Sequence, residues 1–213
     1  MLVLLNGWSL LTYWMEPGRR ARLSLSNAIR HFATITHHKI VVANHCFRSG
    51  LYRQGLTHDL SKYSFTEFRI GMKYYTGIKS PNSGERQELG YSTAWLHHKG
   101  RNRHHFEYWI DIKNNGDATL EGKKMPTRYV VEMFCDRVAA SKVYQGSAYT
   151  DKSSLTYYRL EQSVGPLLMH PDTAALLERL LVKLAKEGEK ETFRYIRNEI
   201  VKPRYIEGEG GRF

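Results

Sequence analysis

Residues 23–47 read LSLSNAIRHFATITHHKIVVANHCF, and this stretch decides the class of fold. Five of its side chains recur at spacings of four, three, four and three residues: His31, Ile35, His38, Val42 and His45. Such spacing places them on one face of an α-helix, which has about 3.6 residues per turn. The stretch therefore predicts a long helix that carries three histidines among the apolar side chains of one face.

Helix signals continue along the rest of the chain. Ser64 and Glu67 have the spacing of a capping box, which predicts a helix up to about residue 75, and Pro126 suits the first turn of another helix. Apolar periodicity predicts further helices over 85–99, near residue 104, and over 154–168, 171–186 and 189–202. Residues 113–124 are expected to form a solvent-facing loop, with a β-hairpin as the alternative. The whole pattern predicts an all-α fold.

The chain has 213 residues, which is enough for one medium-sized domain with an appendage. We expect a helical core over residues 23–150 and a helical extension over 151–205 that packs on this core. Residues 1–22 are expected to be an N-terminal arm or the product of a wrongly assigned start codon. The glycine-rich residues 206–213 are expected to be a frayed tail.

Composition narrows the kind of partner and compartment. A formal net charge of +11 makes the surface attractive to phosphate-bearing partners, whether small nucleotides, nucleic acid or anionic membrane. The apolar residues 1–15 are too short to span a bilayer, so we expect no membrane partner. Cys46 and Cys135 are the two cysteines, and both fall within apolar helical patterns. Buried free thiols and a cytoplasmic location follow.

The histidines point to a metal site. Nine of the ten lie between His31 and His105. Imidazole and carboxylate ligands suit Mn, Fe, Zn or Ni, whereas the shortage of thiolates argues against a zinc finger or an iron–sulfur cluster. The adjacent pair His58 and Asp59 is the sharpest local feature, because a backbone turn at a helix end lets neighbouring ligands reach one or two ions. We therefore expect a divalent transition metal with a catalytic role.

The motif His58-Asp59-Leu60-Ser61-Lys62 resembles the HD-x-x-K signature of the HD superfamily of metal-dependent phosphohydrolases. Residues 133–139, which read MFCDRVA, resemble the closing aspartate helix of that superfamily, and the resemblance covers about residues 30–145. More narrowly, residues 58–68 and 95–109 resemble an uncharacterised family of small bacterial and phage proteins. The resemblance implies an HD-domain-like helical bundle with additional C-terminal helices.

The superfamily pattern also implies the metal ligands, for one or two ions. His38 would be the first ligand, His58 and Asp59 the central pair, and Asp136 the last. The middle ligands come from two histidine doublets and are expected to be His98 and His105, with His97 and His104 as alternates.

In such a metal site, residues near the ligands would have roles in catalysis and substrate binding. Asp59 would ligate the metal and orient a water, and Lys62, one turn after His58, would hold a phosphate as a point charge. Arg101 and Arg103 are candidate phosphate clamps. Asn102 would orient a ligand or cap a helix that starts near His104. The expected function is hydrolysis of a phosphate ester, with a nucleotide as the preferred substrate.

Other interpretations compete with this one. His31 and His45 are expected to be structural histidines, and Asp136 would otherwise pair with Arg137 or Arg101. The chain would alternatively be a basic nucleic-acid-binding protein with structural histidines, contacting phosphates through the C-terminal helices and through Arg19, Arg20, Arg22, Lys123 and Lys124. A third possibility is an HD-type protein that binds a metal or nucleotide for regulation without turnover.

Overall fold

The structure is a computed structural model that describes residues 23–114, 116 and 118–203. The described chain is helical apart from one short hairpin, which confirms the predicted all-α fold. The expected N-terminal arm over residues 1–22 and the expected tail over 206–213 lie outside the described residues.

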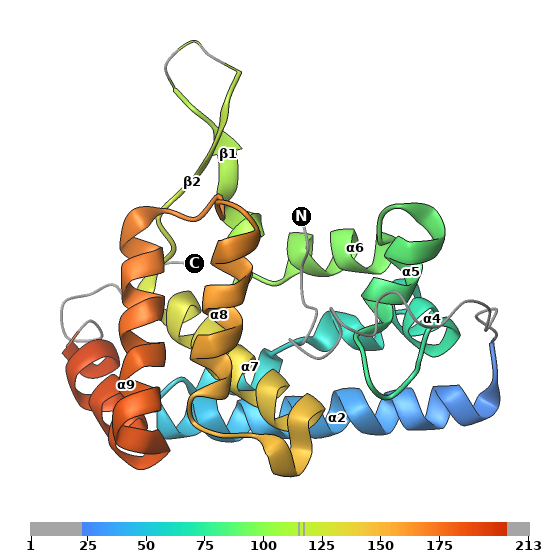
Figure 1. The fold of residues 1–213 in the computed structure, drawn as a ribbon, viewed down its shortest axis with the longest axis horizontal. Coiled ribbons are helices and arrows are strands. Elements are labelled where there is room, and N and C mark those ends of the chain that lie inside the picture. Colours follow the sequence, from blue (N-terminus) through green and yellow to red (C-terminus); the bar gives the residue numbers. More distant parts are fainter. Residues whose placement is uncertain (1–22, 115, 117, 204–213) are drawn as a thin grey trace.

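Helix α2 (Leu25–Arg48) is the long helix predicted from residues 23–47, and it runs along one side of the molecule (Figure 1). The hydroxyl of Ser24 accepts a hydrogen bond from the backbone N–H of Asn27 at 3.0 Å, which caps the first turn. The buried side of the helix carries the predicted row of His31, Ile35, His38, Val42 and His45, together with Cys46. Helix α2 packs against α7 (Thr127–Gln145) and, at His31, against α4 (Phe65–Lys73), so the three histidines of the row face the interior.

The C-terminal helices share one hydrophobic core with α2 and α7. Helices α8 (Ser153–Val164) and α9 (Pro171–Tyr195) and the π-helical segment η4 (Ile196–Val201) stand side by side in Figure 1. Fully buried residues of this core include Phe134, Tyr158, Leu177, Leu181, Leu184 and Ile196. The two helices expected over 171–186 and 189–202 are both present. The range of α9 runs across them, but the backbone of Gly188 (φ 77°, ψ 173°) is not helical and kinks the chain between them.

A second group of short helices follows α2 in the chain. It consists of α3 (Tyr52–Thr57), the 3₁₀ turn η1 (Leu60–Tyr63), α4 (Phe65–Lys73), α5 (Pro81–Leu89), α6 (Thr93–Arg101) and the 3₁₀ turn η2 (Phe106–Trp109). Helix α3 packs on the C-terminal half of α2 and α4 on its N-terminal half. The prediction of a single helix over 85–99 was wrong, because two helices, α5 and α6, occupy this part of the chain. Gly90 adopts φ 80° and ends α5, and Ser92 then caps α6 by accepting from the N–H of Trp95.

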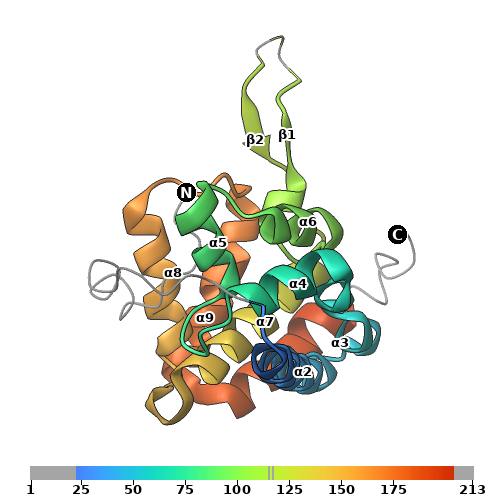
Figure 2. The ribbon, with the colours of Figure 1, turned by 90° about the vertical axis from the view of Figure 1, so that its right-hand side faces the viewer.

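A β-hairpin projects from the helical body (Figures 1 and 2). Strands β1 (Ile110–Ile112) and β2 (Leu120–Gly122) pair antiparallel, with Ile112 opposite Leu120. The expected solvent-facing loop over 113–124 was therefore wrong in part, and the alternative of a hairpin is observed. Three residue pairs suffice because the strands are held at their base, where the N–H of Lys123 donates to the carbonyl of Trp109 at 2.7 Å.

One expectation from composition is also met in the described part of the chain. Cys46 and Cys135 are free and buried, as predicted. None of the described helices has the length and apolar character that crossing a bilayer demands.

The packing of α4 on α2 yields a stability prediction. A Cβ atom on Gly71 of α4 would lie 2.0 Å from the Nε2 atom of His31 of α2. We expect Gly71→Ala to lower the free energy of unfolding by about 1–3 kcal/mol, measured by urea denaturation. Gly100→Ala is the control, because a Cβ there meets nothing within 4 Å. Both substitutions replace a helical glycine by alanine, so they gain the same helix propensity. Equal changes in the free energy of unfolding would therefore contradict a close contact between Gly71 and His31.

Candidate metal centre

The His58–Asp59 pair lies at a sharp turn between α3 and η1. Asp59 adopts φ 53° and ψ 28°, and no other non-glycine residue in the described ranges has a positive φ. Asp tolerates this left-handed conformation better than most residues, yet such positions cost on the order of 1 kcal/mol or more and often mark functional sites. The turn directs two consecutive side chains into one buried centre, where both are at most 2% exposed.

Lys39 of α2 holds this turn in place. Its Nζ atom donates to the carbonyl oxygens of Leu56 and His58, each at 2.8 Å. These carbonyls lie at the C-terminal end of α3, where a helix leaves acceptors unpaired and favours a cation. Lys39 therefore ties the strained Asp59 turn to the helix that also carries His38.

One group of ligand atoms gathers where α2, the turn and α7 meet. Its atoms lie within 4.8 Å of one another and come from His38, His58, Asp59 and Asp136. The Nε2 atom of His38 lies 2.9 Å from Oδ1 of Asp136. The Nε2 atom of His58 lies 3.2 Å from Oδ2 of Asp59 and 3.5 Å from Oδ1 of Asp136. The structure thus brings together four of the expected ligands: the first, His38, the central pair, His58 and Asp59, and the last, Asp136.

A second group uses the other oxygen of the same aspartate. It consists of Asp59, His98, His104 and His105. The Oδ1 atom of Asp59 lies 3.3 Å from Nε2 of His98 and 3.4 Å from Nε2 of His104. The sequence preferred His105 and kept His104 as the alternate, whereas the structure places both in this group. His97 lies outside it.

Two glutamates contact the Nδ1 atoms of candidate ligand histidines, on the side of each ring away from Asp59. The Oε1 atom of Glu132 lies 3.0 Å from Nδ1 of His58 and 3.3 Å from Nδ1 of His104. The Oε2 atom of Glu67 lies 2.8 Å from Nδ1 of His98, and its Oε1 atom lies 2.7 Å from Nδ1 of His97. With Nδ1 occupied, the Nε2 atoms of His58, His98 and His104 are turned toward Asp59, an arrangement typical of metal-binding histidines.

Sequence reasoning missed both glutamates. Glu132 stands four residues before Asp136 on α7, so helical spacing places it on the same face, and this signal was present in the sequence. Glu67 was assigned to a capping box. Its backbone N–H does donate to the Ser64 hydroxyl at 3.4 Å, but its side chain serves His97 and His98 instead.

The donor atoms fit a bound cation. Several buried ligand atoms form no regular hydrogen bond: Nε2 of His38, His58, His104 and His105, and both carboxylate oxygens of Asp59. Two of them do have charged neighbours, because Lys62 Nζ lies 2.5 Å from Oδ2 of Asp59 and Oδ1 of Asp136 lies 2.9 Å from Nε2 of His38. Buried polar atoms nearly always have a partner, because leaving one unpaired costs about 1–3 kcal/mol. The convergence of so many ligand atoms without regular hydrogen bonds is explained if metal ions are their partners. These buried histidine and acid clusters could therefore hold a metal ion.

Local electrostatics also suit a cation. Burial and then the nearby Lys62 lower the pKa of His38, and burial lowers that of His105 still more, so both imidazoles are neutral near pH 7. Burial opposes ionisation of Asp59, yet His58 and Lys62 hold its pKa well below the ordinary value. Burial likewise opposes charge on His58, but Asp59 raises its pKa well above normal. Metal binding to His58 would then release a proton.

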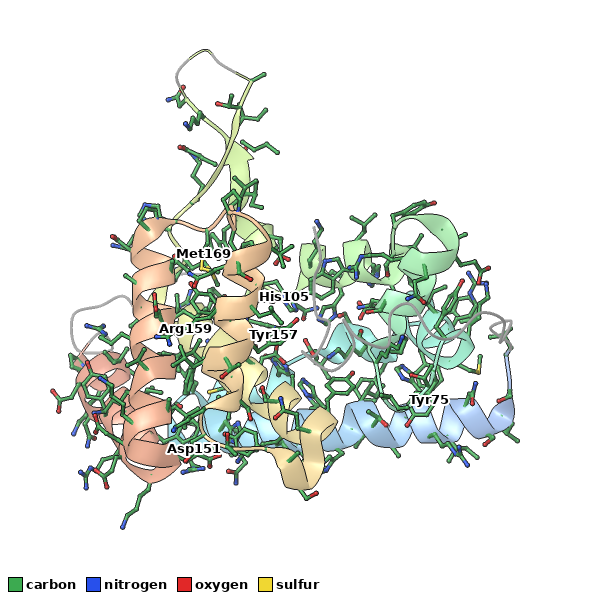
Figure 3. All side chains as sticks on the ribbon, viewed as in Figure 1. Tyr75, His105, Asp151, Tyr157, Arg159 and Met169 are labelled. Carbon is green, nitrogen blue, oxygen red and sulfur yellow. The ribbon has the colours of Figure 1, made fainter. Side chains whose placement is uncertain are left out.

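A cavity of about 150 Å³ opens beside the centre. Its walls include His38, His98, His105 and Asp136 from the two groups, and Lys62, whose Nζ atom lies 2.5 Å from Oδ2 of Asp59. The aromatic residues of its lining are Tyr75, Trp95, Tyr144 and Tyr157. Tyr157 of α8 and His105 are labelled close together near the middle of Figure 3, so the C-terminal extension forms one wall.

The other residues expected to bind substrate do not line this cavity. Arg101 is exposed at the end of α6. The guanidinium of Arg103 lies 5.8 Å from the centre of the Tyr108 ring and donates to the Tyr129 hydroxyl. Asn102 is buried, and its Nδ2 atom donates to the hydroxyl of Ser61 and to the carbonyl of His98, both at 2.8 Å. Its position fits the support of His98.

His31 and His45 lie apart from both ligand groups, consistent with their expected structural roles. His31 packs against the rings of Phe68 and Tyr75, with centroids 5.3 and 5.9 Å away, and burial lowers its pKa to about 4. The Nδ1 atom of His45 lies 3.3 Å from the carbonyl of Cys135, and burial lowers its pKa to about 4 as well. Both are therefore neutral side chains of the helix interfaces.

The role of Glu132 leads to a prediction about metal affinity. Glu132→Gln keeps the size of the side chain but weakens its contacts with His58 and His104. We expect the affinity for a transition metal to fall by about 10- to 100-fold, measured by competition with a chromogenic chelator. Glu161→Gln is the control, because Glu161 pairs with Arg137 instead of a candidate ligand. Unchanged affinity in Glu132→Gln would remove Glu132 from the centre.

Comparison with known proteins gives the family of the chain. Residues 27–183, more than half of the chain, match DUF5662, a family of unknown function. No curated protein and no solved structure matches. The matched region contains both ligand groups and both supporting glutamates. The chain therefore belongs to the DUF5662 family.

Proposed function

We propose that this protein is a metal-dependent phosphohydrolase of the HD type that acts on a nucleotide. One observation carries the proposal: the two carboxylate oxygens of Asp59 face two different sets of histidines. A carboxylate placed in this way is suited to bridge two cations, and two-cation sites are common in enzymes that cleave phosphate esters. The order of the ligands along the chain, with Lys62 after the His58–Asp59 pair, supports the same reading.

The residues for each ion follow from the two groups. His38, His58, Asp59 and Asp136 would hold one ion, and Asp59, His98, His104 and His105 would hold the other. This donor set of nitrogens and oxygens favours Mn, Fe, Zn or Ni. When bound, such an ion lowers the pKa of a coordinated water toward neutrality and neutralises charge on phosphoryl oxygens.

Lys62 has the position of a phosphate-binding residue. Burial opposes its charge, but Asp59 and Asp136 raise its pKa above the ordinary value, so the ammonium is charged at neutral pH. Its side chain is 28% exposed and lines the cavity, so it can reach a ligand while it contacts Asp59. Its role is to hold a phosphoryl oxygen next to the ligand groups.

The cavity supports a substrate with a planar apolar part. Tyr75, Trp95, Tyr144 and Tyr157 supply flat surfaces on which a base can stack. Lys79 adds a second cation to the lining, whereas Arg137 is already paired with Glu161 at 2.6 Å. A phosphate at the centre and a base among the aromatic side chains would use both halves of the lining, which is why a nucleotide is the preferred substrate class.

The proposal predicts metal content that depends on Asp59. Protein purified without chelator or metal-binding tag should contain one or two equivalents of a transition metal by elemental analysis. Asp59→Asn keeps a residue type that tolerates the left-handed turn but removes the charge, so we expect metal affinity to drop more than about 100-fold. His38→Asn should also lose metal, whereas His37→Asn, at the exposed neighbouring position, should not. A metal-free wild type after anaerobic reconstitution would refute the proposal.

A second prediction separates catalysis from metal binding. Lys62→Met should retain metal but release phosphate from a responsive nucleotide at least about 100-fold more slowly, because a charge at the reacting group is lost. Lys79→Met, farther from the ligand groups, should change the rate less. Metal-loaded wild type that releases phosphate from no nucleotide would point to a regulatory protein without turnover.

A further inference from the structure

Helix α2 has an unusual outer side. Its buried side carries the histidine row, and its exposed side carries a second row at helical spacing. The exposed fractions are 77% for Leu25, 62% for Ile29, 51% for Phe32 and 62% for Ile40. Folding leaves these large apolar side chains in water, although burying each would gain about 1.5–3 kcal/mol. From Leu25 to Ile40 the row extends about 22 Å along the helix.

Neighbouring segments extend this row into a surface. The turn η1 is attached beside it, because the rings of Phe32 and Tyr63 are 5.8 Å apart and the hydroxyls of Thr36 and Tyr63 lie 3.0 Å apart. The bond from Lys39 to the carbonyl of Leu56 attaches α3 farther along. Figure 2, which looks along α2, shows α3 beside it. Leu56 and Leu60 add side chains that are 66% and 54% exposed.

We call this surface the outer face and define it by Leu25, Ile29, Phe32, Ile40, Leu56 and Leu60. Large exposed apolar side chains gathered on neighbouring elements typically mark a site of interaction with a protein or a membrane. On α2 itself the outer face is separate from the histidine row, which is buried.

The charges around the outer face decide between partners. Between residues 23 and 66 the chain has one acidic residue, Asp59, and it is buried in the candidate metal centre. Arg30 of α2 and Arg53 of α3 are exposed, and Arg69 follows on α4. If a second copy of the chain bound to the outer face, the arginines of the two copies would lie close together and repel one another. An anionic surface that accepts apolar side chains is complementary both to these arginines and to the apolar side chains of the outer face.

We propose that the outer face binds the surface of a bilayer that contains anionic phospholipids. The apolar row would enter the boundary between headgroups and acyl chains, and the arginines would contact lipid phosphates. Binding to the membrane surface departs from the expectation of no membrane partner. It needs no membrane-spanning helix, and none is found among the described residues. It does not depend on the metal or on catalysis.

The test is cosedimentation of the full chain with vesicles. We expect binding to vesicles of equimolar phosphatidylglycerol and phosphatidylcholine, weaker binding at high salt, and little binding to phosphatidylcholine alone. The double variant Ile29→Gln/Ile40→Gln should bind at least about tenfold more weakly, because two inserted side chains become polar. Ile112→Gln/Leu120→Gln is the matched control, since these residues are 57% and 54% exposed on the hairpin.

Three results would overturn the proposal. The first is no binding to the anionic vesicles, and the second is equal loss of binding in the outer-face and hairpin variants. The third comes from light scattering and thermal unfolding without lipid. If Ile29→Gln/Ile40→Gln dissociates an oligomer or lowers the melting temperature, the outer face is already covered by a second copy or by another part of this chain. An unchanged mass and melting temperature, with lost vesicle binding, supports the lipid contact.

Discussion

The candidate site depends on the left-handed turn at Asp59. An extended or helical backbone would send the side chains of His58 and Asp59 in different directions, whereas φ 53° brings both into one centre. The conformation costs energy, and the bonds from Lys39 to the carbonyls of Leu56 and His58 help to hold it. With Asp59 in this position, its two oxygens face histidines from α2 and the turn on one side and from the α6–η2 region on the other.

The hydrophobic core supplies the rigidity that such a centre needs. Helices α2 and α7 carry His38, Glu132 and Asp136, and both pack against α9 through residues that water does not reach. Burial raises the cost of every charge in the centre, so the acids and histidines are stable there only when they neutralise one another or bind a cation. The same burial keeps His38 and His105 neutral, which is the form that binds a metal.

Several parts of the site could be predicted from the sequence because they depend on local spacing. The row of His31, His38 and His45 follows from helical periodicity, and the His58–Asp59 pair is adjacent in the chain. The choice within each doublet could not be predicted in this way. His97 and His98 both lie on α6 and both contact Glu67, but His98 is the one whose Nε2 atom lies 3.3 Å from Oδ1 of Asp59, a contact between residues far apart in the chain. Arg101 and Arg103 lie next to ligands in sequence, yet they do not line the cavity.

The amino-acid sequence by itself determined the all-α class and the long helix α2, since these follow from interactions between residues a few positions apart. It also contained the order of the candidate ligands along the chain, which the superfamily pattern matched. Tertiary structure alone decided that Asp59 is shared by two ligand groups, that Glu67 and Glu132 support the histidines, and that α8 closes the cavity. These features require contacts between residues far apart in the chain. Their geometry is set by how the helices pack together, which helical periodicity does not encode.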